Sequence, residues 1–467
     1  MITFILNNQL IKTDNPAGIS LLDFIRYQKD LPGTKIGCRE GDCGACTVLE
    51  GRLEANEVVY KSIVSCLTPL GNVQGKHIVT IEGLNMKHLS PVQNAMVDNA
   101  ATQCGFCTPG LVMSLTGHGM SKGISTKDLA MASVSGNICR CTGYKSIERA
   151  AESISKLYQG KSVEKPIEWL VKNNFLPEYF LTIQMQLADI ENPQTNKKSA
   201  SKIIGGGTDL MVQKADEIYE SELDLFYDRE DLRLIKKEHN NCIIGASVTA
   251  NELMHSPIML DIIPTIKDYF KLISSEPIRN MGTVAGNIMN ASPIADLSIF
   301  FLALNTSVQL KLDNNTRIVP LKNFFLAYKK FDIKEGEYIE SISFPIPEKE
   351  YLFNFEKVSK RTYLDIASVN TAFFVKYKNE VIEECRISVG GVSPVPLFLK
   401  LTSEYLSEKH ITNGVIIKAN SIMQEEISPI SDIRGSEEYK RLLLRQLLFA
   451  HFIKLFPEKI SLRELVS

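Results

Sequence analysis

The hydrophobic pattern begins with features of a small β-rich domain. The apolar run Ile2–Leu6, followed by Asn7 and Asn8, predicts a strand, a turn and a second strand. Ser20 is a suitable N-cap for a helix with an apolar face, which Pro32-Gly33 would end. The next residues are too rich in glycine for a regular element. The chain therefore opens with a hairpin, a short helix and a long loop.

From Ser90 onward the pattern is helical. Ser90 and Thr108 each precede a proline and can cap a helix that begins there. Ser125 or Thr126 opens another helix, and a fourth is expected over about 146–157. We predict a bundle of four short helices in this part of the chain.

The remainder alternates between strand-like and helical patterns after a polar stretch. Residues 158 to about 200 are weakly periodic and predict a linker or a wrapped connection. The expected elements beyond it are a strand at 203–204, a strand at 223–226, a hairpin within 232–244 that turns at 240–241, helices at 249–255 and 264–273, strands at 371–377 and 385–389, and a long helix after 437. With 467 residues, the chain should form three or four domains of an α+β type.

Composition excludes several classes of protein. An apolar content of 44% and a net charge of -2 disfavour both disorder and nucleic-acid binding. The N-terminus lacks the features of a secretory signal, and apolar stretches such as Leu297–Leu304 are too short to cross a bilayer. We expect a soluble cytoplasmic protein without a membrane partner. In a reducing cytosol, clustered cysteines more often bind metal than form disulfides.

Eight of the ten cysteines lie in the first third of the chain, in two groups of four. The first group consists of Cys38, Cys43, Cys46 and Cys66. Its spacing, C-x4-C-x2-C with a distant fourth cysteine, matches the plant-type [2Fe-2S] pattern. Glycines between these cysteines allow the backbone to curl around an anionic centre. A zinc site is the alternative, but zinc sites usually show two knuckles of similar spacing.

The second group is less diagnostic on its own. It consists of Cys104, Cys107, Cys139 and Cys141, a C-x2-C pair with a C-x-C pair. Such a set is compatible with a cluster, with zinc or with a redox dithiol. A helix that starts directly after Cys107 would direct its positive end toward the site, which favours an anionic cluster.

Three motifs taken together resemble a known family. Residues 37–47 (GCREGDCGACT), 103–110 (QCGFCTPG) and 136–144 (GNICRCTGY) resemble the iron-sulfur part of the xanthine dehydrogenase family of molybdenum hydroxylases. The resemblance implies that each cysteine group binds a [2Fe-2S] cluster. It also implies that the second cluster lies nearest the molybdopterin and that Gln103 faces the pterin.

Later segments resemble the flavin-binding part of the same family. Residues 203–210 (IIGGGTDL) resemble the FAD pyrophosphate loop, and 282–297 resemble the second flavin segment. Residues 357–367 resemble the loop near the isoalloxazine, and 434–441 resemble a signature of the last domain. The residues thereby assigned to FAD are Ile204, Gly205, Gly206, Gly207, Thr208, Asp209, Thr283, Val284, Gly286, Asn287, Asp296 and Lys357. Many relatives place an aromatic residue against the flavin where this chain has Ile273, with Phe270 three residues earlier, so we expect flavin stacking to differ.

The resemblance also implies a domain organisation. The expected order is a plant-ferredoxin-like β-grasp [2Fe-2S] domain (1–83), a four-helix-bundle [2Fe-2S] domain (84–158), a linker (159–198), an α+β FAD-binding domain of the PCMH/VAO-like type (199–345) and a CO dehydrogenase flavoprotein-like α+β C-terminal domain (346–467). Cys242 and Cys385 fit neither cysteine group and are expected to be buried structural thiols.

The expected function follows from the resemblance. The molybdenum-binding portion of the family is longer than this whole chain, so we expect it on a large partner subunit, in a heterotetramer of two small and two large chains. Electrons from oxidation of hypoxanthine or xanthine to urate would pass through the Cys104 cluster and the Cys38 cluster to FAD, and then to NAD+. This role requires no catalytic nucleophile or general base in this chain.

Three alternatives remain open on the sequence alone. The chain could serve another molybdenum hydroxylase that acts on an aldehyde, a nicotinate-like heterocycle or an aromatic acyl-CoA. It could be a diaphorase that works without a molybdenum partner. A zinc-stabilised scaffold without redox activity is the alternative from a different class.

Overall fold

The protein, represented by a computed structural model, is described over residues 1–190, 202–348 and 350–466. It divides into two compact units. The first contains Met1–Asp228 and Ser275–Gly282, and the second contains Arg229–Ser274 and Thr283–Ser467. The predicted FAD-binding domain, residues 199–345, therefore contributes to both units. The expectation of an α+β multidomain fold is confirmed.

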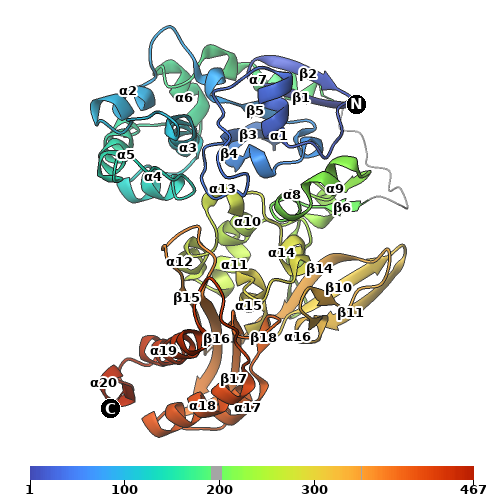
Figure 1. The fold of residues 1–467 in the computed structure, drawn as a ribbon, viewed down its shortest axis with the longest axis vertical. Coiled ribbons are helices and arrows are strands. Elements are labelled where there is room, and N and C mark those ends of the chain that lie inside the picture. Colours follow the sequence, from blue (N-terminus) through green and yellow to red (C-terminus); the bar gives the residue numbers. More distant parts are fainter. Residues whose placement is uncertain (191–201, 349, 467) are drawn as a thin grey trace. The chain divides into compact units, whose positions relative to one another are not determined.

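The first unit begins with a five-stranded sheet in the order β2-β1-β5-β3-β4 (Figure 1). The predicted hairpin is confirmed as an antiparallel pair of β1 and β2, and Ser20 caps the following helix by accepting a hydrogen bond from Asp23 N. The elements are β1 (Ile2–Leu6), β2 (Gln9–Thr13), α1 (Leu21–Asp23), η1 (Phe24–Gln28), β3 (Thr47–Glu54), β4 (Glu57–Val64), η2 (Ser65–Leu67), η3 (Leu70–Val73), β5 (His77–Val79) and η4 (Ile81–Leu84).

Four helices follow, as the sequence predicts: α2 (Pro91–Asp98), α3 (Thr108–Met120), α4 (Lys127–Ser133) and α5 (Lys145–Leu157). Ser90 caps α2 through a capping box with Gln93, and Thr126 caps α4. Thr108 is not the N-cap, because α3 already begins at this residue and Cys107 occupies the capping position. The prediction thus placed this helix start one residue too late.

The segment predicted as a linker or a wrapped connection packs onto the helical bundle where the structure describes it. Residues 159–190 contain α6 (Pro166–Lys172), η5 (Glu178–Leu181) and α7 (Ile183–Ala188). Leu170, Phe175 and Phe180 are buried in the same hydrophobic cluster as the four-helix bundle. These apolar residues are too widely spaced to give a clear periodic signal, but they suffice to dock the segment. Residues 191–198 of the predicted linker lie outside the described residues.

Two later segments complete the core of the first unit. Their elements are β6 (Lys202–Ile204), α8 (Leu210–Gln213), α9 (Ala215–Glu220), β7 (Leu223–Leu225) and α13 (Glu276–Arg279). Strands β6 and β7 pair in parallel. Ile204, Ile218 and Met281 share one buried cluster with Phe24 and Leu67 of the N-terminal sheet domain. Burial of these apolar side chains fixes both segments against that domain.

The second unit contains a five-stranded sheet in the order β11-β10-β14-β9-β8 and a two-stranded sheet of β12 and β13. The predicted hairpin is present, although its turn falls at His239-Asn240, one residue earlier than expected. The elements are η6 (Glu230–Leu232), β8 (Ile235–Glu238), β9 (Asn241–Gly245), α10 (Ala250–His255), α11 (Pro257–Ile262), α12 (Ile266–Lys271), α14 (Val284–Asn290), α15 (Asp296–Ala303), β10 (Ser307–Leu312), β11 (Asn315–Pro320), α16 (Leu321–Phe324), β12 (Phe325–Ala327), β13 (Lys330–Phe331) and β14 (Tyr338–Pro345).

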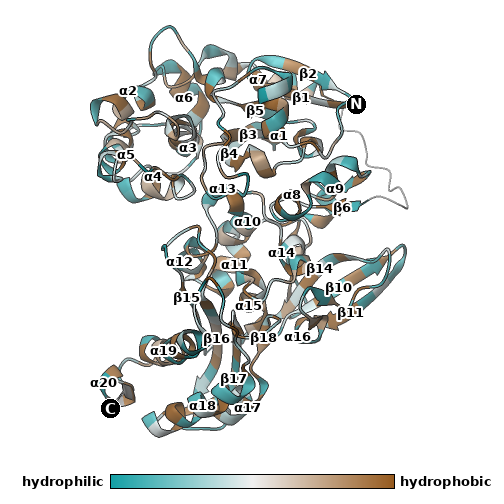
Figure 2. Cartoon of the chain, viewed as in Figure 1, coloured by the Kyte–Doolittle hydropathy of each residue, from teal (hydrophilic) through white to brown (hydrophobic). Residues whose placement is uncertain are grey.

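A four-stranded antiparallel sheet, in the order β15-β16-β17-β18, forms the rest of the second unit. Helix α15 is buried after Asp296 and packs against β16 and β17, and all of its residues except Asp296 and Ser298 are apolar. Figure 2 shows its mainly hydrophobic character. The elements are β15 (Tyr351–Val358), β16 (Val369–Lys378), β17 (Val381–Gly390), β18 (Leu397–Phe398), α17 (Lys400–Leu406), α18 (Asn413–Glu426), α19 (Glu437–Leu455) and α20 (Leu462–Val466). In the described parts of the chain, no helix combines the length and apolar character needed to cross a membrane.

Candidate cofactor sites

The first cysteine group lies on the loop before β3 and on η2 after β4. Cys38 N points at Cys43 Sγ at 3.4 Å, and Glu40 N points at Cys38 Sγ at 3.3 Å. A Cβ at Gly37 would lie only 2.6 Å from Cys43 Sγ, so the loop leaves no room for another side chain there. Sulfurs surrounded by backbone amides fit an anionic iron-sulfur centre, because these donors stabilise negative charge on sulfur.

The sulfurs of this group form two contacting pairs. A hydrogen bond with Cys43 lowers the pKa of Cys38 to about 5 and raises the pKa of Cys43. The corresponding bond between Cys46 and Cys66 lowers the pKa of Cys46 and raises the pKa of Cys66. In each pair the contact therefore favours ionisation of one sulfur, and the thiolate is the form that binds metal.

The second group lies around the start of α3 and on the loop between α4 and α5. Cys104 and Cys141 are exposed and their sulfurs lie 3.4 Å apart. Cys107 and Cys139 are buried, and burial raises the pKa of Cys107 to about 12. Helix α3 begins directly after Cys107, so its positive N-terminal end lies at this group as the sequence predicts. Gln103 is exposed beside these cysteines.

No three His, Cys, Asp or Glu side chains of the described residues converge as ligands of a single metal ion. The structure brings each group together as two pairs of sulfurs, and the assignment of four ligands to each cluster stays a prediction. The geometry fits it, because backbone amides or a helix N-terminus point at sulfurs of both groups.

The two cysteine loops are bound directly to each other. Ile138 N donates to the Cys43 carbonyl at 2.9 Å. The buried side chain of Asn137 donates to the Gly44 carbonyl at 3.0 Å and accepts from Ser114 Oγ at 2.8 Å. A Cβ at Gly110 would collide with the same Gly44 carbonyl, so the helix start and the first loop approach backbone to backbone. Sequence reasoning could not find this contact, because its members are about 90 residues apart.

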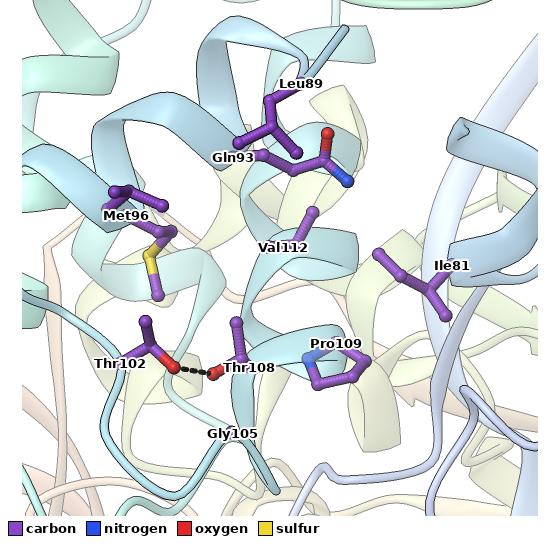
Figure 3. A pocket seen from close by; sticks show the side chains of 10 residues that line it. Ile81, Leu89, Gln93, Met96, Thr102, Gly105, Thr108, Pro109 and Val112 are labelled. Carbon is purple, nitrogen blue, oxygen red and sulfur yellow. Dashed lines mark hydrogen bonds between the residues drawn. The ribbon is translucent and has the colours of Figure 1, made fainter. Parts of the chain in front are cut away.

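An apolar cavity of about 320 Å³ adjoins the second cysteine group (Figure 3). Leu89, Met96 and Val112 line it, together with Gly105 from the cysteine loop itself. The Thr102 and Thr108 hydroxyls lie at its edge and share a hydrogen bond of 2.7 Å (Figure 3). This bond joins the loop before Cys104 to the first turn of α3.

The glycine loop predicted to hold the FAD pyrophosphate follows β6 in the first unit. A Cβ at Gly206 would collide with the Met281 carbonyl, and one at Gly207 would lie 2.6 Å from the Leu67 carbonyl. Gly207 also has a φ of +82°, which side-chain-bearing residues rarely adopt. Asn72 Nδ2 donates to the Gly205 carbonyl at 2.8 Å. The glycines therefore allow this loop to pack against two backbone carbonyls, and its approach to a phosphate group stays a prediction.

The second predicted flavin segment lies in the second unit. Thr283 caps α14, and its hydroxyl accepts from Gly286 N at 3.1 Å. Asn287 Oδ1 accepts from Ser298 N at 3.3 Å, which joins α14 to α15. Within this unit, the predicted residues Thr283, Gly286 and Asn287 therefore define one helix start and its contact with the next helix.

Asp296 and Lys357, both predicted from the sequence, are brought together. Lys357 Nζ lies 2.8 Å from Asp296 Oδ2 and also donates to the Leu272 carbonyl at 2.8 Å. Asn370 Nδ2 donates to the other carboxylate oxygen of Asp296 at 2.5 Å. Sequence reasoning missed Asn370, whose importance appears only when β15 and β16 pair and make it the cross-strand partner of Lys357.

The aromatic residue near the expected flavin-stacking position does not replace the missing one. Phe270 is fully buried, and its ring centroid lies 5.3 Å from that of Phe300 in an edge-to-face contact. Ile273 is also buried, with 3% exposure. Ile273 has no aromatic ring to stack on a flavin, and the ring of Phe270 packs inside the second unit.

Comparison with protein families matches four successive segments. Residues 4–70 match the 2Fe-2S iron-sulfur cluster binding domain, and residues 80–152 match the [2Fe-2S] binding domain. Residues 186–347 match the FAD binding domain in molybdopterin dehydrogenase, and residues 355–455 match the CO dehydrogenase flavoprotein C-terminal domain. The two cysteine groups and the predicted flavin segments fall within the matched domains.

Curated relatives and solved structures agree with this order. A xanthine dehydrogenase of Oryza sativa subsp. japonica is 27% identical over 532 residues, which cover 95% of this chain and 39% of the relative. Aldehyde oxidase 1 of Macaca fascicularis is 25% identical, and the match covers 97% of this chain and 39% of that relative. The chain thus spans about two fifths of the length of these relatives.

A solved structure of carbon monoxide dehydrogenase from Hydrogenophaga pseudoflava, which lacks the Mo-pyranopterin moiety of its cofactor, is 26% identical with a TM-score of 0.51. The match covers 54% of this chain and 88% of that chain. Together these similarities show that the chain has the iron-sulfur and flavin domains of the molybdenum hydroxylases, with two [2Fe-2S]-binding domains and one FAD-binding domain.

Proposed function

We propose that this chain is the electron-transfer subunit of an NAD-dependent xanthine dehydrogenase. Its partner would be a large molybdopterin-binding chain that oxidises hypoxanthine and xanthine to urate, in a heterotetramer of two small and two large chains. When bound, [2Fe-2S] clusters supply one-electron chemistry and FAD supplies the exchange between one-electron and two-electron chemistry. The role of this chain is to hold these groups in order and close together.

One structural relationship carries the proposal. Within the first unit, the second cysteine loop is hydrogen-bonded to the first through Ile138 and Cys43. The first cysteine group in turn adjoins the glycine loop, because Leu67, the neighbour of Cys66, packs against Gly207. Three candidate cofactor loops therefore lie in sequence, each in backbone contact with the next. This order supports electron transfer from the second cysteine group toward the flavin loop.

The ligand sets that we propose follow the same order. Cys104, Cys107, Cys139 and Cys141 would hold one cluster, and Cys38, Cys43, Cys46 and Cys66 the other. The backbone of Gly205–Gly207 would approach the FAD pyrophosphate. We propose a location in the reducing cytoplasm, where clustered cysteines more often bind metal than form disulfides.

The choice of xanthine over another substrate rests on the similarity to xanthine dehydrogenases. The aldehyde oxidase relative supports a second candidate, in which the same arrangement serves an aldehyde-oxidising enzyme. The partner chain would contain the substrate pocket in both cases, so assays of the intact complex distinguish the two candidates.

The test is to purify the complex through a tag on this chain and to assay it with xanthine, an aldehyde and nicotinate. We expect a large molybdopterin-containing chain to co-purify and xanthine to yield urate with reduction of NAD+. Preferential oxidation of an aldehyde, or O2 as the only acceptor, would contradict the xanthine dehydrogenase assignment. Addition of NADH to the isolated chain tests its own role, because a bound flavin should be reduced without the partner.

A further inference from the structure

A buried cluster of charges joins the first [2Fe-2S] domain to flavin-binding segments of the same unit. Glu50 and Lys61 are cross-strand partners on β3 and β4, with Glu50 Oε1 3.3 Å from Lys61 Nζ. Glu50 Oε2 lies 3.2 Å from Lys76 Nζ. Glu50 and Lys76 expose only 1% and 3% of their surface. Charges buried to this extent are tolerated only when they are paired, so separating the segments that carry them would leave an unpaired buried charge.

The Lys61 ammonium also reaches two residues of the FAD-binding region. It donates to Tyr227 Oη at 2.8 Å and to the Asn280 carbonyl at 3.2 Å. Tyr227 Oη donates to the same carbonyl at 2.9 Å. Asn280 Nδ2 donates back to the carbonyl of Ser62, the neighbour of Lys61, at 2.8 Å. Both the main chain and the side chain of Asn280 are thus bound to the β4 region.

Asn280 directly precedes Met281, and the glycine loop packs against the Met281 backbone. The Met281 carbonyl forms the wall that excludes a Cβ at Gly206. Gly207, the next residue of the loop, packs against the Leu67 carbonyl. A shift of Asn280 would therefore move one wall of the glycine loop relative to the cysteine group that contains Cys66.

Lys61 is not required to keep Glu50 paired. Lys76 contacts both Glu50 and Asp228, the latter at 2.7 Å, and Asp228 also pairs with Arg52 at 2.9 Å. Three cations thus face the two carboxylates of Glu50 and Asp228. Without Lys61, Glu50 would keep one partner, whereas the Asn280 carbonyl would lose its ammonium donor. The contribution specific to Lys61 is therefore the bond to the flavin-binding region.

We infer that Lys61 is a positioning residue for FAD, which fixes the glycine loop against the first cysteine group by holding Asn280 and Tyr227. This inference rests on the proposed function, because it assumes that the loop binds FAD. The hydrogen bonds of the Lys61 side chain go to Tyr227 and Asn280, and Asn280 is followed directly by the Met281 carbonyl that walls the loop. Lys61 therefore acts on the glycine loop indirectly, through the backbone of 280–281.

The test compares Lys61→Met with Lys61→Arg and with Lys311→Met in the full-length chain. Lys311 also pairs with a carboxylate across a sheet, through Glu340, and serves as a matched control. Loss of a charge-assisted hydrogen bond typically weakens binding by about tenfold or more. We expect Lys61→Met to raise the Kd for FAD by about this factor and to speed hydrogen exchange at residues 204–208 and 278–282. Lys61→Arg should restore most of the affinity, and Lys311→Met should change neither quantity.

Unchanged FAD affinity and unchanged exchange in Lys61→Met would overturn the inference. If Lys61→Met fails to fold, the double variant Glu50→Gln with Lys61→Met removes both charges, and it should fold while still binding FAD weakly. Tight FAD binding by that double variant would also overturn the inference. Absence of FAD from the unmodified chain would instead refute the proposed function, while the exchange comparison would still decide whether Lys61 holds the loop.

Discussion

Ile138 N donates a hydrogen bond to the Cys43 carbonyl at 2.9 Å, and these two residues belong to different cysteine loops. Cys43 is itself a proposed ligand, and Ile138 directly precedes the proposed ligand Cys139. The two loops are therefore held at a fixed spacing by backbone atoms, which do not depend on flexible side chains. One hydrogen bond therefore links the backbone of the proposed ligand Cys43 to the backbone next to the proposed ligand Cys139.

Asn137 stabilises this contact between the loops, and its replacement should weaken it. Its side chain is buried and bonds to both Gly44 and Ser114. We expect Asn137→Ala to lower the free energy of unfolding by about 1–3 kcal/mol, because buried partners lose their hydrogen bonds. Chemical denaturation measures this change, and electron paramagnetic resonance (EPR) should show altered signals from both clusters. Asn173→Ala removes an exposed side-chain bond within one helix and should have little effect on either.

Iron content distinguishes the proposed ligands from the remaining cysteines. Cys66→Ala should reduce iron from about four to about two atoms per chain, because a [2Fe-2S] cluster holds two irons. Cys385 is also buried but lies in the second unit without another cysteine beside it among the residues described. Cys385→Ala should therefore leave the iron content unchanged. Equal iron loss in the two variants, measured by metal analysis, would contradict the ligand assignment.

The glycine loop should be intolerant of side chains for a steric reason. Gly207 and Gly160 have nearly identical φ values, +82° and +83°, but an added Cβ would meet another atom within 4 Å at Gly207 and none at Gly160. Gly160→Ala should cost only about 1 kcal/mol for the left-handed backbone. Gly207→Ala adds a clash with the Leu67 carbonyl and should sharply reduce FAD binding. Fluorescence titration with FAD checks this, and similar affinities in both variants would refute the role of the loop.

Two buried histidines, His77 and His451, and the half-buried His118 should make the folded state less stable in mild acid. Burial lowers the pKa of His77 to about 3, of His118 to about 4 and of His451 to about 3, from an ordinary value of 6.5. In the unfolded chain these histidines bind protons below about pH 6.5, whereas in the folded chain they stay neutral down to about pH 3–4. Stability should fall as the pH drops through this window, by about 2 kcal/mol for each buried histidine at pH 5.

His451 isolates this effect in the second unit. Its Nδ1 accepts a hydrogen bond from Asn354 Nδ2 at 2.8 Å, and its Nε2 is hydrogen-bonded to Thr371 Oγ1 at 2.6 Å. Glutamine can form comparable bonds. We expect His451→Gln to recover about 2 kcal/mol of the stability lost between pH 7 and pH 5. Denaturation by urea at both pH values measures the difference. The exposed His239 serves as the control, and an equal effect of His239→Gln would argue against burial as the cause.

The sequence predicted those features that depend on near neighbours in the chain. The hairpin of β1 and β2 and the capping of α2 by Ser90 are confirmed, and α3 begins within one residue of its predicted start. Each of these features is determined by a few adjacent residues. The cysteine spacing likewise predicted the two [2Fe-2S] domains that the family comparison bears out.

Contacts between distant segments could not be predicted in this way. Asn370 reaches Asp296 only because two strands pair, and Asn280 reaches Lys61 across 219 residues of sequence. The helices within residues 166–188 were not predicted, because the composition of this segment is polar and only a few apolar side chains, such as Leu170 and Phe175, dock it. The burial of His451 could not be predicted from neighbouring residues either, because its hydrogen-bond partners lie on β15 and β16.

The central claim is that the two cysteine groups each hold a [2Fe-2S] cluster in a chain that also binds FAD. Anaerobic reduction of the purified protein with dithionite, followed by EPR spectroscopy and metal and flavin analysis, tests it most directly. We predict two distinct cluster signals of about one spin each, with about four irons and about one FAD per chain. Zinc in place of iron, or an iron-loaded protein that shows no signal after reduction, would contradict the account.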